Sequence, residues 1–157
     1  MRTNTTRLAK LLPIAAAVLS LSGAASLAGE CPADKVGVDV TAKSDAPAND
    51  VTDTVIAMID LKQESVSIDR KFRLRRLEVQ PGGVVPWHSH GERPAIIYIV
   101  SGAITEYRST CAVPIEHKAG EVTAETKAVS HWWKNNGNET AVLLSSDLLA
   151  DPNDKNM

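Results

Sequence analysis

Apolar and polar residues alternate over short stretches along most of the chain, and this period of two predicts β-strands rather than helices. The stretches are rich in β-branched and aromatic residues, at residues 55–61, 72–79, 95–100, 103–108 and 141–148. Turn signals with Gly, Pro or Asn follow at residues 80–83, 101–102, 119–120 and 135–138. No sustained amphipathic helix or internal repeat is found. The pattern therefore predicts a single all-β domain, built as a sandwich or a barrel.

The first 28 residues have the pattern of a secretory signal peptide. Arg2, Arg7 and Lys10 precede a mostly apolar stretch, and small residues then lead to a cleavage site after Ala28. The alternative is a membrane anchor, but the apolar run is shorter than the roughly 20 residues that a spanning helix needs. We therefore expect an exported protein, periplasmic or secreted, with no membrane span after cleavage.

The mature chain divides into three parts by composition. Residues 29–50 are rich in Asp, Ala, Pro, Ser and Asn and predict a loosely ordered N-terminal arm. The strand pattern covers residues 51–150, and residues 151–157 form a polar tail. A chain of 157 residues with 43% hydrophobic content suits one globular domain.

The mature chain holds two cysteines, Cys31 and Cys111. In an oxidising compartment an even number of cysteines indicates a disulfide, which here would tie the N-terminal arm to the domain. Two unlinked thiols are the alternative.

Charge excludes one class of partner and leaves one unusual segment. The chain has 17 basic and 19 acidic residues, and removal of residues 1–28 leaves 14 against 19, a net charge of about −5. Nucleic acid is therefore excluded as a partner, since phosphate binding needs clustered positive charge. Residues 70–76 carry five cations. The favoured interpretation is a strand with Phe72 and Leu74 on one face and solvated charges opposite; the alternative sends one Arg into a cavity to meet an anion.

Three of the four histidines have the spacing of a metal site. His88 and His90 are separated by one residue, so on a strand both imidazoles lie on the same face. His131 begins another expected strand just after a turn. Neutral imidazoles suit one divalent transition metal ion, such as Fe, Mn, Ni, Cu or Zn.

The same residues resemble the two motifs of the cupin superfamily, in particular small type-2, quercetin-dioxygenase-like cupins. The matching positions are Gly82, His88, His90 and Gly102 in the first motif, and Gly120, His131 and Asn135 in the second. The resemblance implies a jelly-roll β-barrel with a metal inside, bound by His88, His90 and His131. It also implies a candidate homodimer, because cupins often pair barrels edge to edge.

The sequence departs from these motifs at the metal-binding Glu. Ala95 stands in its place, and Thr126 and Ala128 replace a Pro and a Gly of the second motif. In one interpretation Glu92 bends in as a fourth ligand. In the other, which we favour because Glu92 lies in a predicted turn, the three histidines leave the remaining positions to water and substrate.

A site of neutral ligands leaves the metal charge uncompensated and should attract a small anionic molecule. A metal-dependent oxidoreductase, dioxygenase-like and acting on a small organic anion, is the leading functional hypothesis. A periplasmic protein that binds a metal or small ligand without turnover is the second. A degenerate cupin without metal, serving as a dimerising domain, is the third.

Other side chains have two interpretations each. Arg93 is a candidate for binding a substrate carboxylate, or an exposed loop residue. Trp133 shares its strand face with His131 and is a candidate for lining the pocket, or simple core. His117 matches no motif position and is expected at the surface.

Overall fold

The computed structural model describes residues 29–66 and 68–150. The predicted signal peptide and the predicted polar tail lie outside these residues. Within them the secondary structure consists of eight β-strands and two 3₁₀ turns, with no α-helix. The prediction of an all-β fold is confirmed.

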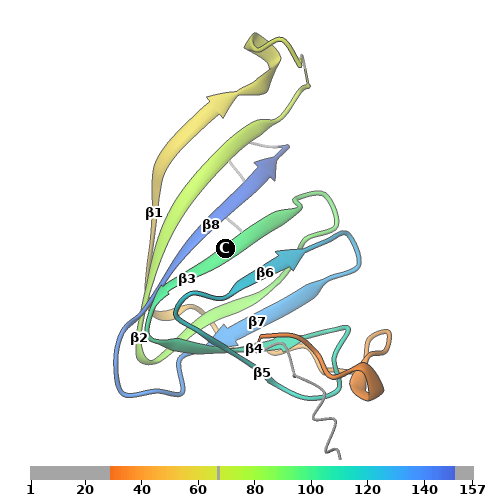
Figure 1. The fold of residues 1–157 in the computed structure, drawn as a ribbon, viewed down its shortest axis with the longest axis vertical. Coiled ribbons are helices and arrows are strands. Elements are labelled where there is room, and N and C mark those ends of the chain that lie inside the picture. The colour runs from red at the N-terminus through yellow and green to blue at the C-terminus, as the bar shows by residue number, and fades with distance from the viewer. Residues whose placement is uncertain (1–28, 67, 151–157) are drawn as a thin grey trace, which may run out of the picture.

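The elements follow one another in the order of Figure 1. The strands are β1 (Asn49–Asp60), β2 (Lys71–Ser89), β3 (Ala95–Ser101), β4 (Ala103–Arg108), β5 (Ile115–Lys118), β6 (Val122–Glu125), β7 (Ser130–Lys134) and β8 (Ala141–Leu149). The 3₁₀ turns are η1 (Ala33–Lys35) and η2 (Leu61–Gln63). The sequence pattern missed β5 and β6, because four residues are too few to show a period of two clearly.

Strand β2 is long because it pairs with different neighbours along its length. Residues 71–79 pair with β1 and β8, and residues 84–89 pair with β7. Gly83 lies between these two parts, where a Cβ would stand 2.7 Å from the carbonyl oxygen of Asp50, so only glycine fits. The full order is β5-β4-β7-β2-β8-β3-β6, with β1 beside β2. Figure 1 shows these strands wrapped around a common interior, and the predicted jelly-roll barrel is confirmed.

The barrel interior is apolar at one end and polar at the other. In the register between β2 and β8, Leu77 faces Leu143 and Val79 faces Ala141, whereas Arg75 faces Ser145. The core cluster gathers at the apolar end and comprises Leu77, Val79, Val85, Ile97, Ile99, Ile104, Trp133, Ala141 and Leu143. The functional side chains are therefore held against a packed hydrophobic base.

The face of β2 expected to be solvated is in fact the inner one. Arg73 and Arg75 are buried, whereas Phe72 is 44% exposed, so the favoured interpretation of residues 70–76 was wrong. These arginines share their strand face with the core residue Leu77, and buried Asp147 on β8 accepts hydrogen bonds from Arg73 at 2.7 and 3.0 Å. An acidic partner inside the barrel makes burial of these cations tolerable.

A disulfide between Cys31 and Cys111 ties the N-terminal arm to the barrel, as predicted. A β-bridge between Val36 and Cys111 adds a second contact beside it. The first strand begins at Asn49, within the predicted arm, whereas the preceding residues contribute only η1 and irregular structure.

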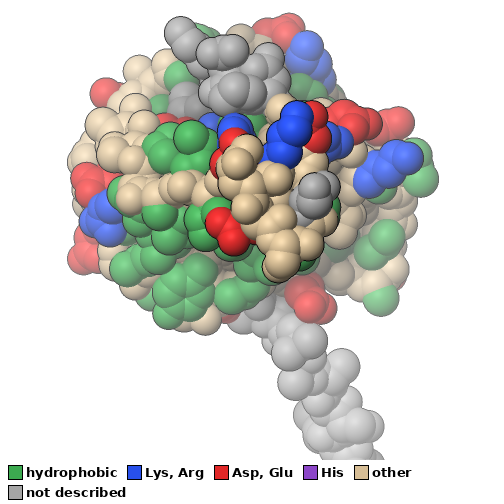
Figure 2. Space-filling model, turned by 90° about the horizontal axis from the view of Figure 1, so that it is seen from above, with side chains coloured by type: hydrophobic (Ala, Val, Ile, Leu, Met, Phe, Trp, Pro, Cys, Tyr) green, Lys and Arg blue, Asp and Glu red, His purple; other side chains and the backbone are tan. Residues whose placement is uncertain are grey.

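Apolar side chains stand on the outside of the barrel over β3 and β6. Ile96, Tyr98, Val100 and Val122 are each at least 40% exposed, and hydrophobic side chains also gather on part of the face seen in Figure 2. Homodimer formation stays a prediction, since nothing in the structure identifies what covers this surface. Among the described residues there is no helix of the length and apolar character that would cross a bilayer.

Reduction of the disulfide should destabilise the protein. The bond joins residues 80 positions apart in the sequence, and closing a loop of that size in the unfolded chain contributes about 4 kcal/mol in the chain-entropy model. Urea unfolding of the mature protein with the bond intact and with Cys31→Ser/Cys111→Ser should show a loss of that order. Equal midpoints and slopes for the two proteins would contradict the prediction.

Candidate metal centre

Three imidazoles from two adjacent strands converge at the polar end of the barrel. His88 on β2 lies directly opposite His131 on β7 in the strand register, and His90 follows β2 on the same face as His88. The Nε2 atoms are 3.1 Å apart between His88 and His90, and 3.0 Å from each of these to His131. All three side chains are buried, and no histidine is visible on the face shown in Figure 2. The structure thus brings together the three histidines that the motifs predict.

The other ring nitrogen of each histidine has a fixed acceptor. Nδ1 of His88 donates to the carbonyl oxygen of Pro86 at 2.9 Å, and Nδ1 of His90 donates to that of Arg93 at 2.8 Å. Nδ1 of His131 donates to the Glu106 carboxylate at 2.6 Å. Because carbonyl and carboxylate oxygens only accept, each proton must reside on Nδ1, and each Nε2 presents a lone pair. Three lone pairs therefore face one another at the centre of the cluster.

This arrangement fits a bound cation. Lone pairs 3.0–3.1 Å apart repel one another unless a positive ion lies among them. At that separation, ligand nitrogens subtend about 90° at an ion with metal–nitrogen bonds of about 2.1 Å, which is nearer an octahedral than a tetrahedral angle. The donor set, its tautomers and its spacing all suit a divalent transition metal.

The local environment keeps the rings of His88 and His90 neutral. Burial, followed by the charge of the nearby His131 ring, lowers the pKa of His88 to about 2. The same two causes, in the same order, lower the pKa of His90 to about 3. Since metal ligation requires unprotonated imidazole, both rings are ready to bind at neutral pH.

Glu106 anchors the cluster from behind. It is fully buried on β4 and accepts from Nδ1 of His131 through Oε1 and from Nε2 of His117 through Oε2, the latter at 3.0 Å. Arg108 forms an ion pair with the same carboxylate at 3.0 Å. Burial alone would raise the pKa of Glu106, but the hydrogen bonds from both histidines and the charge of Arg108 hold it well below its usual range. A negative charge thus lies one hydrogen bond behind a candidate ligand, an arrangement that orients histidines at metal sites.

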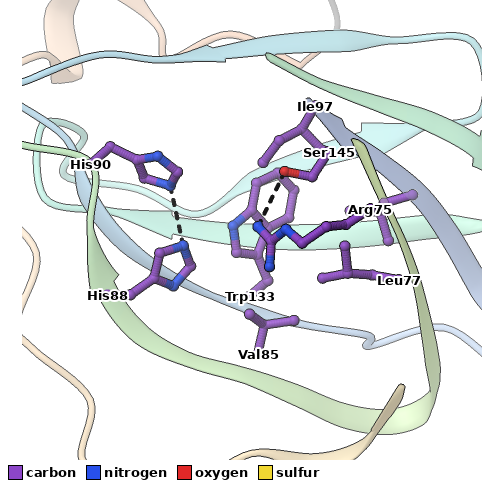
Figure 3. Close-up of a pocket in the computed structure, with 9 residues that line it drawn as sticks. Arg75, Leu77, Val85, His88, His90, Ile97, Trp133 and Ser145 are labelled. Atoms are coloured by element: carbon purple, nitrogen blue, oxygen red, sulfur yellow. Dashed lines mark hydrogen bonds between the residues drawn. The ribbon is translucent and has the colours of Figure 1, made fainter. Parts of the chain in front are cut away.

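A small cavity opens in front of His88 and His90. Figure 3 shows Trp133 at its back and the guanidinium of Arg75 directed toward the two histidines. The complete lining is Arg75, Leu77, Val85, His88, His90, Ile97, Trp133, Leu143 and Ser145. The indole N–H of Trp133 donates to Nε2 of His131 at 3.3 Å. The cavity is mostly apolar, with few polar groups, as small-molecule sites are.

Comparison with known proteins identifies the family. Residues 75–147, which contain all three candidate ligands, match the family model of the cupin domain. The chain belongs to the cupin superfamily. Over 76 residues it is 33% identical to germin-like protein 5-1 of rice (Oryza sativa subsp. japonica), a match covering 45% of this chain and 33% of that protein. A germin-like protein of Arabidopsis thaliana, subfamily 2 member 2, is 32% identical over 46% of this chain and 35% of its own. The matches thus span about a third of these relatives.

Solved structures agree on the fold. An uncharacterized protein with a double-stranded β-helix domain from Klebsiella pneumoniae has a TM-score of 0.53 at 16% identity, over 68% of this chain and 84% of its own. The cupin domain of Cnp3 from Schizosaccharomyces pombe has a TM-score of 0.51 at 16% identity, over 67% of this chain and 65% of its own. At this level of identity the likeness shows the fold alone.

This cupin offers no carboxylate at the place of the missing motif Glu. Ala95 is buried and pairs with Glu125 on β6 and with Asp147 on β8. Both neighbouring carboxylates are engaged by arginines, Glu125 by Arg108 and Asp147 by Arg73. These two carboxylates balance the charges of buried arginines, so neither serves as an anionic ligand of the histidine cluster.

The remaining motif residues support the fold. Asn135 is fully buried, and its side chain donates to the carbonyl oxygens of Val79 and Glu139 at 2.8 and 2.7 Å. Gly102 has a φ of +73°, and a Cβ there would lie 2.8 Å from the carbonyl oxygen of Thr140. Both residues fix the turns at the apolar end of the barrel.

Two candidate residues lie away from the cavity. The Glu92 side chain is 86% exposed and 3.9 Å from Arg70, so the structure does not bring it to the histidines as a fourth ligand. Arg93, for which an exposed position was the favoured interpretation, is buried and 3.2 Å from Asp147. Its backbone carbonyl, rather than its guanidinium, contacts the cluster through His90. Trp133 does line the cavity, as its strand parity indicated.

Sequence reasoning missed Glu106 behind the site, and its favoured interpretations misplaced Arg75 and His117. Glu106 carried no motif signal, and Arg75 was assigned to the solvated side of its strand. His117 was expected at the surface but is fully buried, because it packs beside Trp133 and donates to Glu106. Charged residues with inward parity on β2 and β4 were the only signal that could have found Arg75 and Glu106.

Glu106→Gln should weaken metal binding without abolishing it. The amide oxygen can still accept from His131, but the negative charge behind the ring is lost, and such changes cost about 10- to 100-fold in metal affinity. Competition between the protein and a chelator for Zn²⁺ measures the change. Glu116→Gln, at an exposed position on neighbouring β5, is the matched control and should retain full affinity. Equal affinities for the two variants would contradict the role of Glu106.

Proposed function

We propose that this cupin holds one divalent transition metal ion with His88, His90 and His131 and acts as an oxidoreductase, dioxygenase-like, on a small organic anion. The observation that carries the proposal is the convergence of three Nε2 lone pairs within 3.1 Å, with every Nδ1 proton engaged elsewhere.

The choice of metal follows from the donors. Imidazole nitrogens suit borderline ions, which leaves Fe, Mn, Ni, Cu and Zn as the candidates. When bound, such an ion supplies Lewis acidity or redox chemistry at its open coordination positions. The chain itself positions three neutral ligands and keeps the side toward the cavity free of any competing carboxylate.

The anionic character of the ligand follows from charge. Neutral histidines leave the metal charge uncompensated at the site, and the guanidinium of Arg75 adds a positive group to the cavity wall. The apolar side chains Leu77, Val85, Ile97 and Leu143 exclude water and strengthen the attraction of an anion to both groups. Once the metal is bound, a cationic substrate would be repelled from the same cavity.

The proposal includes export to the periplasm or the extracellular space. The disulfide between Cys31 and Cys111 supports it, because such bonds persist in oxidising compartments. The signal peptide that predicts export lies in residues outside the described part of the chain.

A protein that binds a metal or small ligand without turnover is the second candidate. The cavity lining favours it, because its described residues include no carboxylate, lysine, tyrosine or cysteine. Proton transfer in catalysis would then fall to the histidines or to a metal-bound water. Both candidate functions use the same three ligands and differ only in whether the bound anion is converted.

Removal of a ligand tests the metal site. His88→Ala and His131→Ala should each lower the affinity for Zn²⁺ by more than about 100-fold, a larger loss than a change in an outer partner causes. Elemental analysis after dialysis against a weak chelator measures retention, and circular dichroism checks that the barrel is folded. Glu116→Gln, at an exposed position on β5, should retain the metal. Full metal content in both alanine variants would exclude the site.

Turnover separates the two candidate functions. Protein reconstituted separately with each of the five metals should consume oxygen or form product with at least one member of a panel of small carboxylates, enolates and thiolates. His131→Ala should remove that activity. Metal retention with no turnover in any combination would favour the binding protein.

A further inference from the structure

Arg75 is a buried cation at the edge of an apolar cavity. Only 3% of the residue is exposed, and its guanidinium carries a charge, as arginine side chains in proteins do. The side chain extends from β2 into the cavity, and Figure 3 shows its end directed toward His88 and His90. Burying such a group is costly unless hydrogen bonds satisfy its donors.

The described partners of Arg75 leave part of the guanidinium unsatisfied. One terminal nitrogen pairs with Asp53, and the other donates to Oγ of Ser145 at 3.3 Å. Asp147 lies 3.6 Å from the second nitrogen, beyond hydrogen-bonding distance. Nε is buried and has no hydrogen-bond partner among the described residues. A guanidinium has five N–H donors, so this one retains capacity for an additional acceptor.

The surrounding wall determines what that acceptor can be. Leu77, Val85, Ile97 and Leu143 are apolar, so they offer no hydrogen bond to a ligand. The polar groups nearest the histidines are donors or metal ligands, including the indole N–H of Trp133. A bound molecule with an acceptor at one end and an apolar middle against these walls would satisfy Arg75.

We propose that Arg75 binds the carboxylate of a short aliphatic carboxylic acid whose other end points toward the three histidines. This inference rests on the proposed function, and it adds the substrate class and the residue that selects it. The planar guanidinium matches a planar carboxylate and forms charge-assisted hydrogen bonds with it. The cavity is small, so the ligand must be a short acid.

Calorimetric titration of Zn²⁺-loaded protein tests the proposal. The probes are straight-chain carboxylates from acetate to valerate and the corresponding neutral amides. We expect the carboxylates to bind and the amides to bind at least about tenfold more weakly. Within the carboxylate series, affinity should be highest at one chain length. Arg75→Gln should weaken carboxylate binding by about tenfold or more, the effect of losing a charge-assisted hydrogen bond, at unchanged Zn²⁺ content.

Two further variants control for charge and folding. Arg76→Gln removes the same charge from the next position of β2, on the outer face where it pairs with Glu78, and should bind carboxylates like the wild type. Arg75→Lys keeps the charge beside Asp53 but loses the planar fork, so it should show a severalfold loss even if the Gln variant does not fold.

The proposal is overturned if amides bind as well as carboxylates, if no carboxylate binds, or if the position-75 variants match Arg76→Gln. Failure of the metal site is a separate result. If the wild type retains no Zn²⁺, the proposed function falls, but the comparison of carboxylates with amides on metal-free protein still tests Arg75.

Discussion

The site depends on where three imidazole protons are held. Two backbone carbonyls and one buried carboxylate each accept from an Nδ1 atom, and this fixes both the orientation and the tautomer of the rings. The carbonyls of Pro86 and Arg93 belong to the end of β2 and the turn that follows it, so the backbone itself positions two of the three rings. The three imidazoles are thus held in an orientation that suits metal binding rather than hydrogen bonding to one another.

Burial of the charged side chains at the polar end of the barrel is tolerated because they form ion pairs within the interior. Asp147 faces Arg73, and Glu106 and Glu125 face Arg108. Isolated charges at these depths would be prohibitively costly, and each pair depends on good geometry to offset desolvation. Loss of the motif Glu at Ala95 leaves the histidine cluster neutral, while Glu106 provides a negative charge one hydrogen bond farther away. A metal ion bound there would therefore keep positive character toward the cavity.

The fold and the candidate ligands could be predicted because both follow from local sequence patterns. A period of two placed His88 and His90 on one face and Trp133 with His131, and it placed β3, β4 and β8 within one residue of their ends. The same rule failed at residues 70–76, since it describes two faces without saying which is buried. That choice depends on Asp147, more than 70 positions later in the chain. Glu106 and His117 were missed for the same reason, because their partners meet only once β4, β5 and β7 lie side by side.

Nitrogen-15 NMR of the histidine side chains during a Zn²⁺ titration tests the central claim most directly. Before metal is added, His88, His90 and His131 should all be neutral with the proton on Nδ1. One equivalent of Zn²⁺ should shift the three Nε2 resonances together, while the ring of His117 remains without a metal. Protons on Nε2 in the metal-free protein, or Nε2 resonances that do not respond to Zn²⁺, would contradict the account.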